Sequence, residues 1–380
     1  MNNSEITFNK PFFFGNESKY MQMALRESKI SGDGMFTKKC QKFLEHKYGF
    51  RKVLLTTSCS SALEMCALLI DIKSGDEVII PSFTFVSTAN AFVLRGAKIV
   101  FADSEEGTPN IKVEEIESLI TPQTKAVVCV HYAGIACDLN ALLKLCEKHN
   151  LFLIEDAAQA IDSFYNGVPI GTFGHLSTFS FHETKNITCG EGGMIVINDS
   201  RFITRAETIW AKGTNKNKFL RGEIGEYGWV DIGSSFSPSD ILAAVLFAQL
   251  ENLEKIQTQR IRLWNVYYNL LKPLEDKEFL ALPQLPEYSC NTGHIFYIVC
   301  RSTEERNKLI NILAAQKIQA VFHFNSLHKS EYYFDKHDGR MLHNCEHFSN
   351  CLLRLPLYYE LDDNDIHRIC NFINNYFYLS

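Results

Sequence analysis

The chain has 380 residues, of which 46% are hydrophobic and 22% are charged. This composition is that of an ordinary globular protein with one or two hydrophobic cores. The formal net charge of −6 comes with no basic block or tail, which argues against nucleic acid as a partner. No apolar run is long enough to cross a bilayer, and the N-terminus lacks the pattern of a secretion signal. We therefore expect a soluble, cytoplasmic protein that does not bind membranes.

The first clear elements are a helix over residues 37–48, ending at Gly49, and a short strand over residues 53–55. A hydroxyl-rich turn at residues 56–61 then opens an apolar helix that runs to Leu69. Unpaired N–H groups and the positive end of the dipole make such a helix N-terminus a natural phosphate site. Ordinary capping of the helix by Ser or Thr is the alternative interpretation.

Strands and helices then alternate as far as residue 156. We expect strands at residues 77–81, 98–101, 126–130 and 151–156, with a helix over residues 141–149. This is the alternation of a parallel sheet that is covered by helices. The predicted fold class is therefore α/β, with a mostly parallel sheet in the large domain.

Asp156 ends a strand of the buried type and is followed by small residues. An acid at the carboxyl end of a parallel strand lies where open α/β sheets bind their ligands. Such a carboxylate can face the ring nitrogen of a pyridine cofactor and keep that nitrogen protonated. The alternative is an N-cap for a helix that begins at Ala157.

Lys185 lies in a polar turn between two strand-like runs, residues 179–181 and 194–197. Three glycines within residues 190–193 favour a compact turn, because glycine allows positive φ and close approach of the backbone. A lysine held in a pocket by such a turn can lose its proton and act as a nucleophile. The alternative is an ordinary surface lysine in a hairpin.

The segment from Ser237 to Asp240 resembles a capping box with Pro238 at the first helical position. The helix that follows is expected to continue, with a kink, to about Leu271. It leads from a large domain, residues 1–250 with the N-terminal arm, into a small domain, residues 251–380.

The small domain is predicted to be an α+β unit. Within it, His323 and His328 belong to a polar and aromatic cluster that either contacts a substrate or is an ordinary surface group. The elements expected here are strands at residues 294–299 and 320–324 and helices at residues 304–315 and 364–377.

Twelve cysteines are scattered along the chain without a C-x-x-C pair. Cys59 and Cys66, for example, are too far apart for the spacing of a zinc ribbon. Several others lie in apolar runs, where a free thiol packs as a small hydrophobic group. The sequence therefore predicts reduced thiols and no metal site.

Together these segments resemble the DegT/StrS family of sugar-nucleotide aminotransferases, which use pyridoxal 5'-phosphate (PLP). The resemblance runs in family order over nearly the whole chain, and it is closest in kind to the WecE-type transaminases that act on TDP-4-keto-6-deoxyglucose. The segments that carry it are residues 57–63, 81–90, 131–134, 155–159, 180–193, 231–235 and 327–328.

The resemblance implies the fold type I of PLP-dependent transferases, as in aspartate aminotransferase, and a homodimer with the active site between subunits. It implies that Lys185 is the catalytic Schiff-base lysine and that Asp156 is the acid at the pyridine nitrogen. The remaining implied cofactor contacts are Gln159 near the ring oxygen, Phe85 stacked on the ring, and Ser60, Ser61 and Ser180 around the phosphate. Ser235 stands where many family members place a partner-subunit Asn on the phosphate.

The predicted reaction is a ping-pong transamination of a nucleotide-linked keto-sugar by L-glutamate, giving an amino-sugar and 2-oxoglutarate. Galacto- and gluco-configured 4-amino-4,6-dideoxy products both remain open. His323 and His328 are candidate substrate contacts. A basic loop that includes Lys212 and Arg221 is a candidate for the nucleotide diphosphate, or else an ordinary solvated loop. Bacterial surface polysaccharide, such as O-antigen, is the pathway that such enzymes imply.

Four other functions stay open at this point. A PLP dehydratase of the same family is disfavoured, because that branch typically has His where this sequence has Lys185. An aminotransferase for 3-keto sugars is the nearest rival within the family. A non-catalytic PLP-binding regulatory protein and a plain α/β binding protein are the rivals from other classes.

Overall fold

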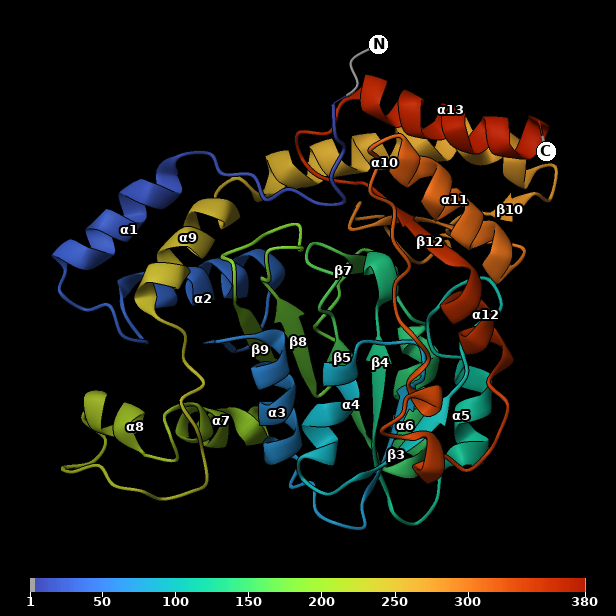
Figure 1. The fold of residues 1–380 in the computed structure, drawn as a ribbon. Helices are drawn as coiled ribbons and strands as arrows, with labels where there is room; N and C mark the ends of the chain where they lie inside the picture. Colours follow the sequence, from blue (N-terminus) through green and yellow to red (C-terminus); the bar gives the residue numbers. More distant parts are fainter. Residues whose placement is uncertain (1–3, 380) are drawn as a thin grey trace.

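The computed structural model describes residues 4–379 of the chain (Figure 1). Its centre is a seven-stranded sheet with the order β1-β9-β8-β5-β4-β2-β3. Every pairing among β2, β3, β4, β5 and β8 is parallel, and β9 pairs antiparallel with both β8 and β1. The strands are β1 (Val53–Thr56), β2 (Glu77–Pro81), β3 (Lys98–Ala102), β4 (Thr124–Val130), β5 (Phe152–Asp156), β8 (Leu176–Ser180) and β9 (Gly193–Ile197).

Both faces of this sheet are buried, as expected of a parallel sheet between helices. In β2, Val78 and Ile80 belong to one hydrophobic cluster, while Ile79 belongs to the cluster on the other face. The α/β fold class with a mostly parallel sheet is therefore confirmed. The helices of this region are α1 (Asn16–Arg26), α2 (Met35–Tyr48), α3 (Cys59–Leu69), α4 (Val86–Val93), α5 (Val113–Leu119), α6 (Leu139–His149), α7 (Ile203–Trp210), α8 (Lys216–Leu220) and α9 (Asp240–Leu250).

A second unit lies at the top of Figure 1, where α10 and α13 run beside each other. It contains a three-stranded antiparallel sheet with the order β10-β11-β12. The large buried ring of Phe296 in β11 packs against Trp264 and Tyr267 of α10. The elements of this unit are α10 (Leu253–Glu275), β10 (Leu280–Ala281), β11 (Phe296–Cys300), α11 (Thr303–Ala315), α12 (His343–Cys351), β12 (Leu352–Leu355) and α13 (Asp363–Leu379). Strands β6 (Phe164–Tyr165) and β7 (Val168–Pro169) form a separate two-stranded antiparallel sheet.

The capping box predicted at Ser237 is wrong. Ser239 is the N-cap of α9, and its hydroxyl accepts from Leu242 N at 3.4 Å. The carboxylate of Asp240 instead accepts from Phe36 N at 3.1 Å and Thr37 N at 2.8 Å, and it thereby caps α2. A carboxylate engaged by another helix cannot reach back to its own N-terminus, which explains why the local pattern misled.

Two other expectations change. The long helix predicted to end near Leu271 is two helices, because the chain turns between α9 and α10. Residues 320–324 form no strand; only Val321 makes an isolated bridge, to Arg354. The N-terminal arm also contacts the small unit, since Ile6 exchanges backbone hydrogen bonds of 2.9 Å with Lys317 and Gln319. The division into a large domain of residues 1–250 and a small domain of residues 251–380 stays a prediction.

Candidate active site

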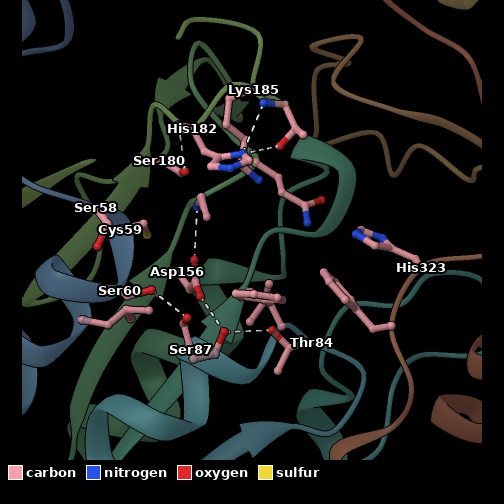
Figure 2. Close-up of a pocket in the computed structure, with 18 of the residues that line it drawn as sticks. Ser58, Cys59, Ser60, Thr84, Ser87, Asp156, Ser180, His182, Lys185 and His323 are labelled. Atoms are coloured by element: carbon pink, nitrogen blue, oxygen red, sulfur yellow. Dashed lines mark hydrogen bonds between the residues drawn. The ribbon is translucent and has the colours of Figure 1, made fainter. Parts of the chain in front are cut away.

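One cavity of about 550 Å³ opens where β5 and β8 end, in front of the N-terminus of α3 (Figure 2). Its volume lies within the range of roughly 300–1,000 Å³ usual for small-molecule sites. Figure 2 shows Ser58, Cys59 and Ser60 on one side, and His323 of the small unit on the other. The cavity therefore lies at the carboxyl edge of the parallel strands, as predicted from the position of Asp156.

Lys185 reaches this cavity from the connection between β8 and β9. The turn is closed by hydrogen bonds from Lys185 N to His182 O at 2.9 Å and from Phe181 N to Gly192 O at 2.8 Å. The residue is partly exposed to the open cavity, but its amine is packed among protein atoms. Burial lowers the pKa of Lys185 to about 8, although the negative charge of Asp156 works in the opposite direction. The position of Lys185 in the wall of a cavity does not fit the alternative of an ordinary surface lysine.

Asp156 is buried, with 4% of its surface exposed, and it lines the same cavity. One carboxylate oxygen accepts from Thr88 Oγ1 at 2.7 Å, and the other accepts from Ala158 N at 3.1 Å. Burial raises the pKa of Asp156, while these two hydrogen bonds and Lys185 oppose the rise. No helix begins at Ala157 in the described structure, so the N-cap alternative does not apply.

The opposite end of the cavity is the N-terminus of α3. Ser58 is the N-cap and accepts from Ser61 N at 3.1 Å, while Ser60 Oγ donates to Ser87 Oγ at 2.6 Å. The first N–H groups of the helix remain as donors for an anion. Gly193 makes this arrangement possible, because a Cβ there would lie 2.4 Å from Cys59 N and 2.6 Å from Ser58 O.

Other predicted cofactor contacts divide into those inside and outside the cavity. Ser180, Phe85 and Gln159 line it. Gln159 Oε1 accepts from Ala133 N at 2.7 Å, which leaves the amide NH₂ group as a donor on the cavity wall. Ser61 does not line the cavity, because its hydroxyl bonds to Thr57 and Ser58 at 2.9 and 3.2 Å.

The predicted substrate contacts divide in the same way. His323 lines the cavity, and its Nδ1 lies 2.7 Å from Tyr132 Oη. His328 is buried outside it, where its ring contacts Ser82 Oγ at 2.7 Å and Glu346 at 3.3 Å. This placement ties the small unit to the turn after β2 and does not support a substrate contact in this chain.

Arg221 and Ser235 also lie outside this cavity. The guanidinium of Arg221 forms ion pairs with Glu207 at 2.9 Å and Glu223 at 2.5 Å. Ser235 lines a second cavity of about 430 Å³, together with Lys212 and other residues of that region. Neither residue is among those that line the cavity of Lys185 and Asp156 in the described chain.

Sequence reasoning missed several residues of the cavity, among them Thr88, Ser87, His182 and Arg354. Thr88 and Ser87 lie within the segment 81–90 that carries the resemblance, and the available signal was a pair of hydroxyl residues in the first turn of a helix. Arg354 also had a signal, since it is a charged residue inside the apolar run of β12.

A buried polar network lies behind Asp156. Glu155 accepts from Gly171 N at 3.0 Å, Gly174 N at 2.7 Å, Ser177 Oγ at 3.0 Å and His131 Nε2 at 3.2 Å. Burial opposes ionisation of Glu155, but these donors hold its pKa below the usual value. The network fixes the end of β5 and so fixes the direction of the Asp156 carboxylate.

The ligand atoms of Cys129, His131 and Cys137 lie within 4.8 Å of one another, a grouping that the sequence did not predict. Both ring nitrogens of His131 are engaged, since Nδ1 accepts from Cys137 N at 3.1 Å and Nε2 faces Glu155. A metal would have to displace one of these bonds. The prediction of no metal site stays a prediction.

A family model for the DegT/DnrJ/EryC1/StrS aminotransferases matches residues 15–374. The chain belongs to this family. The predicted family and enzyme class are therefore confirmed, while a particular closeness to the WecE-type transaminases remains a prediction.

Solved structures agree with this assignment. The aminotransferase TlmJ from Streptoalloteichus hindustanus is 26% identical, with a TM-score of 0.90 over 99% of this chain and 100% of that chain. Helicobacter pylori PseC, an aminotransferase of pseudoaminic acid biosynthesis, is 25% identical, with a TM-score of 0.90 over 99% and 100% of the two chains. A Brucella abortus member of the family is 27% identical, with a TM-score of 0.86 over 95% of each chain. They confirm fold type I for this aminotransferase.

The residues of the cavity fit PLP, the cofactor predicted for this aminotransferase. A helix N-terminus with serine hydroxyls suits the phosphate, Phe85 offers a ring face, and Asp156 offers a buried carboxylate to the pyridine nitrogen. Lys185 supplies an amine of lowered pKa for the aldehyde. Each chemical group of the cofactor therefore has a matching residue in one cavity.

Proposed function

We propose that this aminotransferase transfers the amino group of L-glutamate to a nucleotide-linked keto-sugar. The substrate proposed is TDP-4-keto-6-deoxy-D-glucose, and the products are a TDP-4-amino-4,6-dideoxyhexose and 2-oxoglutarate. The observation that carries the amino-group transfer is the pairing of Lys185 with Asp156 in one cavity. The sugar class is supported by the similarity to PseC, and the 4-keto position rests on the sequence resemblance around residues 181–185.

Different residues of the cavity have different roles in the proposed reaction. PLP, when bound, would supply an electron sink for the electron pair that is left when the α-proton is removed. Asp156 holds the proton on the pyridine nitrogen through its negative charge. Lys185 Nζ takes the proton from the α-carbon of the donor, because an amine with a pKa of about 8 is partly neutral at pH 7. The N-terminus of α3 would hold the phosphate, and Phe85 would offer its ring face to the pyridine.

A homodimer with shared active sites forms part of the proposal. The segment 219–232 exposes an unusual amount of apolar surface, with Trp229 85% exposed and Leu220 and Val230 each 58% exposed. Such patches mark contacts between proteins. In a dimer, Ser235 and the basic loop at Lys212 and Arg221 would serve the partner's cavity, which accounts for their place outside the cavity of their own chain.

Two further parts of the proposal concern cellular context. The cysteines of the described chain are free thiols, and all except Cys290 are buried. Free thiols in this number suit a reducing compartment, which supports a cytoplasmic enzyme. Surface polysaccharide synthesis remains the proposed pathway. No helix among the described residues is long and apolar enough to cross a membrane.

The direct test is incubation of the enzyme with TDP-4-keto-6-deoxyglucose and L-glutamate, followed by NMR of the sugar product. We expect a new amine at C4 and one equivalent of 2-oxoglutarate, and the coupling constants give the galacto or gluco configuration. An amine at C3 from a 3-keto substrate would replace the proposed substrate. Lys185→Ala is the control and should give no product.

A further inference from the structure

A buried amide lies directly after Lys185 and joins three separate segments of the chain. The two residues before Lys185 are exposed, but the side chain of Asn186 enters the interior, and the residue is only 6% exposed. Its Nδ2 donates to Gln257 Oε1 at 2.7 Å and to Thr292 O at 3.0 Å, and its Oδ1 lies 2.8 Å from Nδ1 of His294. Asn186 therefore ties the turn of Lys185 to α10 and to the chain just before β11.

Backbone carbonyls fix the direction of the hydrogen bonds in this group. Thr292 O can only accept, so the part of the Asn186 amide that faces it must be the NH₂ group. Gln257 Nε2 likewise donates to Ile161 O at 3.2 Å, which turns Gln257 Oε1 toward Asn186. Asn186 Oδ1 is then left as an acceptor, so His294 Nδ1 must carry a proton. Each of these side chains therefore has one allowed orientation.

His294 keeps this role in its neutral form. Burial lowers the pKa of His294 well below its usual range, and the positive charges of Lys185 and two arginines act in the same direction. With its proton on Nδ1, the neutral ring donates to Asn186. This hydrogen bond therefore does not depend on charging the imidazole.

One side of α10 supports the whole arrangement. Gln257 and Arg260 lie three residues apart and so project from the same side of the helix. Arg260 Nε donates to Gly293 O at 2.9 Å, and its Nη2 donates to His294 O at 2.6 Å. A Cβ at Gly293 would lie 2.7 Å from the backbone carbonyl carbon of Arg260, so this segment packs directly on the helix. Helix α10 therefore holds the amide of Asn186 both directly and through the chain next to it.

We propose that Asn186 is a positioning residue that sets the place of the Lys185 amine for proton transfer. The proposal rests on the proposed function, in which Lys185 moves the proton. The backbone of Lys185 is held from both sides, because Lys185 N donates to His182 O at 2.9 Å and the side chain of Asn186 anchors the next residue. A misplacement of about 1 Å in a reacting group can lower a rate about 100-fold.

The position of Asn186 predicts how its loss divides between binding and rate. Asn186 is not among the residues that line the cavity of Lys185, so its removal should leave substrate binding intact. Both half-reactions need the proton transfer by Lys185, so both rate constants should fall. A residue that binds one substrate would instead raise the Kd of that substrate alone.

The test measures each half-reaction of the cofactor-loaded enzyme by its absorbance change in a stopped flow, with glutamate or with the keto-sugar nucleotide. Asn186→Ala should lower both rate constants about 10- to 100-fold and leave both apparent Kd values within about threefold. Gln257→Met, which is close in volume but lacks both polar atoms, should lower both rate constants by a smaller factor. It also tests the proposal from a different element if Asn186→Ala fails to fold.

A pair of variants at His294 tests the direction of its hydrogen bond. His294→Asn keeps an N–H donor near the place of Nδ1 and should retain most of both rate constants. His294→Leu removes the donor and leaves Asn186 Oδ1 unpaired, so it should resemble Asn186→Ala. Equal rate constants in the two His294 variants would contradict the assigned donor.

Asn198→Ala is the matched control. Asn198 Nδ2 donates to Gly171 O and Gly174 O, both at 2.8 Å, at the opposite end of β8 from Lys185. This variant also loses two amide hydrogen bonds, but both rate constants should stay unchanged. The Tm and the cofactor spectrum report whether each variant is folded and loaded.

A measurement on the cofactor-free protein does not depend on turnover. Burial lowers the pKa of Lys185 to about 8, and the pH profile of its trace acetylation reports this value. In Asn186→Ala the loosened turn admits water to the amine, so the midpoint should move toward that of an ordinary lysine. In Asn198→Ala the midpoint should stay where it is in the wild type.

Unchanged rate constants or an unmoved midpoint in Asn186→Ala would overturn the inference. Equal losses in Asn198→Ala, or raised Kd values with unchanged rate constants, would overturn it as well. A wild type that shows no spectral change with any amino donor would instead overturn the proposed function, and the acetylation midpoints would still test the hold of Asn186 on Lys185.

Discussion

The lowered pKa of Lys185 yields a quantitative prediction about its chemical reactivity. In the cofactor-free protein, an amine with a pKa of about 8 is about 9% neutral at pH 7, whereas a model lysine with a pKa near 10.4 is about 0.04% neutral. At neutral pH, Lys185 should therefore offer over 200 times more free amine than a lysine in an unfolded peptide. This difference is large enough to measure with an amine-specific reagent.

The assay is competitive acetylation with trace acetic anhydride between pH 6 and pH 11, with Lys185 quantified by peptide mass spectrometry. The unfolded protein serves as the reference for the same peptide. We expect the reactivity of Lys185, relative to this reference, to level off near pH 8. A profile that still rises in parallel with the reference up to pH 10 would refute the argument that burial sets this pKa.

Two variants test which charges set the value. Asp156 raises the pKa of Lys185 and Arg354 lowers it, so Asp156→Asn should move the midpoint to lower pH and Arg354→Gln should move it to higher pH. Shifts in the same direction would show that the variants act through altered packing and not through charge.

Three further outcomes are expected. Thr88→Val removes the 2.7 Å hydrogen bond to Asp156 and should lower kcat about 10- to 100-fold, whereas Thr88→Ser should retain most activity in the same steady-state assay. Gly193→Ala should weaken PLP binding in fluorescence titrations, since its Cβ would lie 2.4 Å from Cys59 N; an unchanged Kd would contradict the proposed contact. Because the pKa of Glu155 is held low in the folded state, its stabilisation is full above the pKa of an unfolded carboxyl group and is lost as the pH falls through the folded value. Glu155→Gln should therefore lower the Tm at pH 7 and make the Tm fall less steeply as the pH is lowered, as measured by calorimetry. A plot of Tm against pH that runs parallel to that of the wild type would count against this network.

The sequence was sufficient for features that depend on local pattern. The alternation of buried strands and helices gave the parallel sheet, and the residues at strand ends gave Asp156 and Lys185. These two side chains are separated along the chain, but β5 and β8 are neighbours in the sheet. Their meeting therefore follows from the rule that parallel strands present their carboxyl ends at one edge.

The features that the sequence did not predict depend on contacts between distant segments. Asp240 has the form of a local helix cap, yet its carboxylate is used by α2. His328 has the form of a polar site residue, yet Ser82 and Glu346 hold its ring in the interior. Arg354 reaches the cavity only because the small unit folds back over the strand ends. No local periodicity encodes these three outcomes.

The central claim is that Lys185 is the residue that holds PLP. The most direct measurement is borohydride reduction of the purified enzyme, followed by proteolysis and mass spectrometry of the pyridoxyl-labelled peptide. The account predicts a single label, on Lys185, and none in Lys185→Ala. A label on another lysine, or a protein that takes up no PLP, would contradict it.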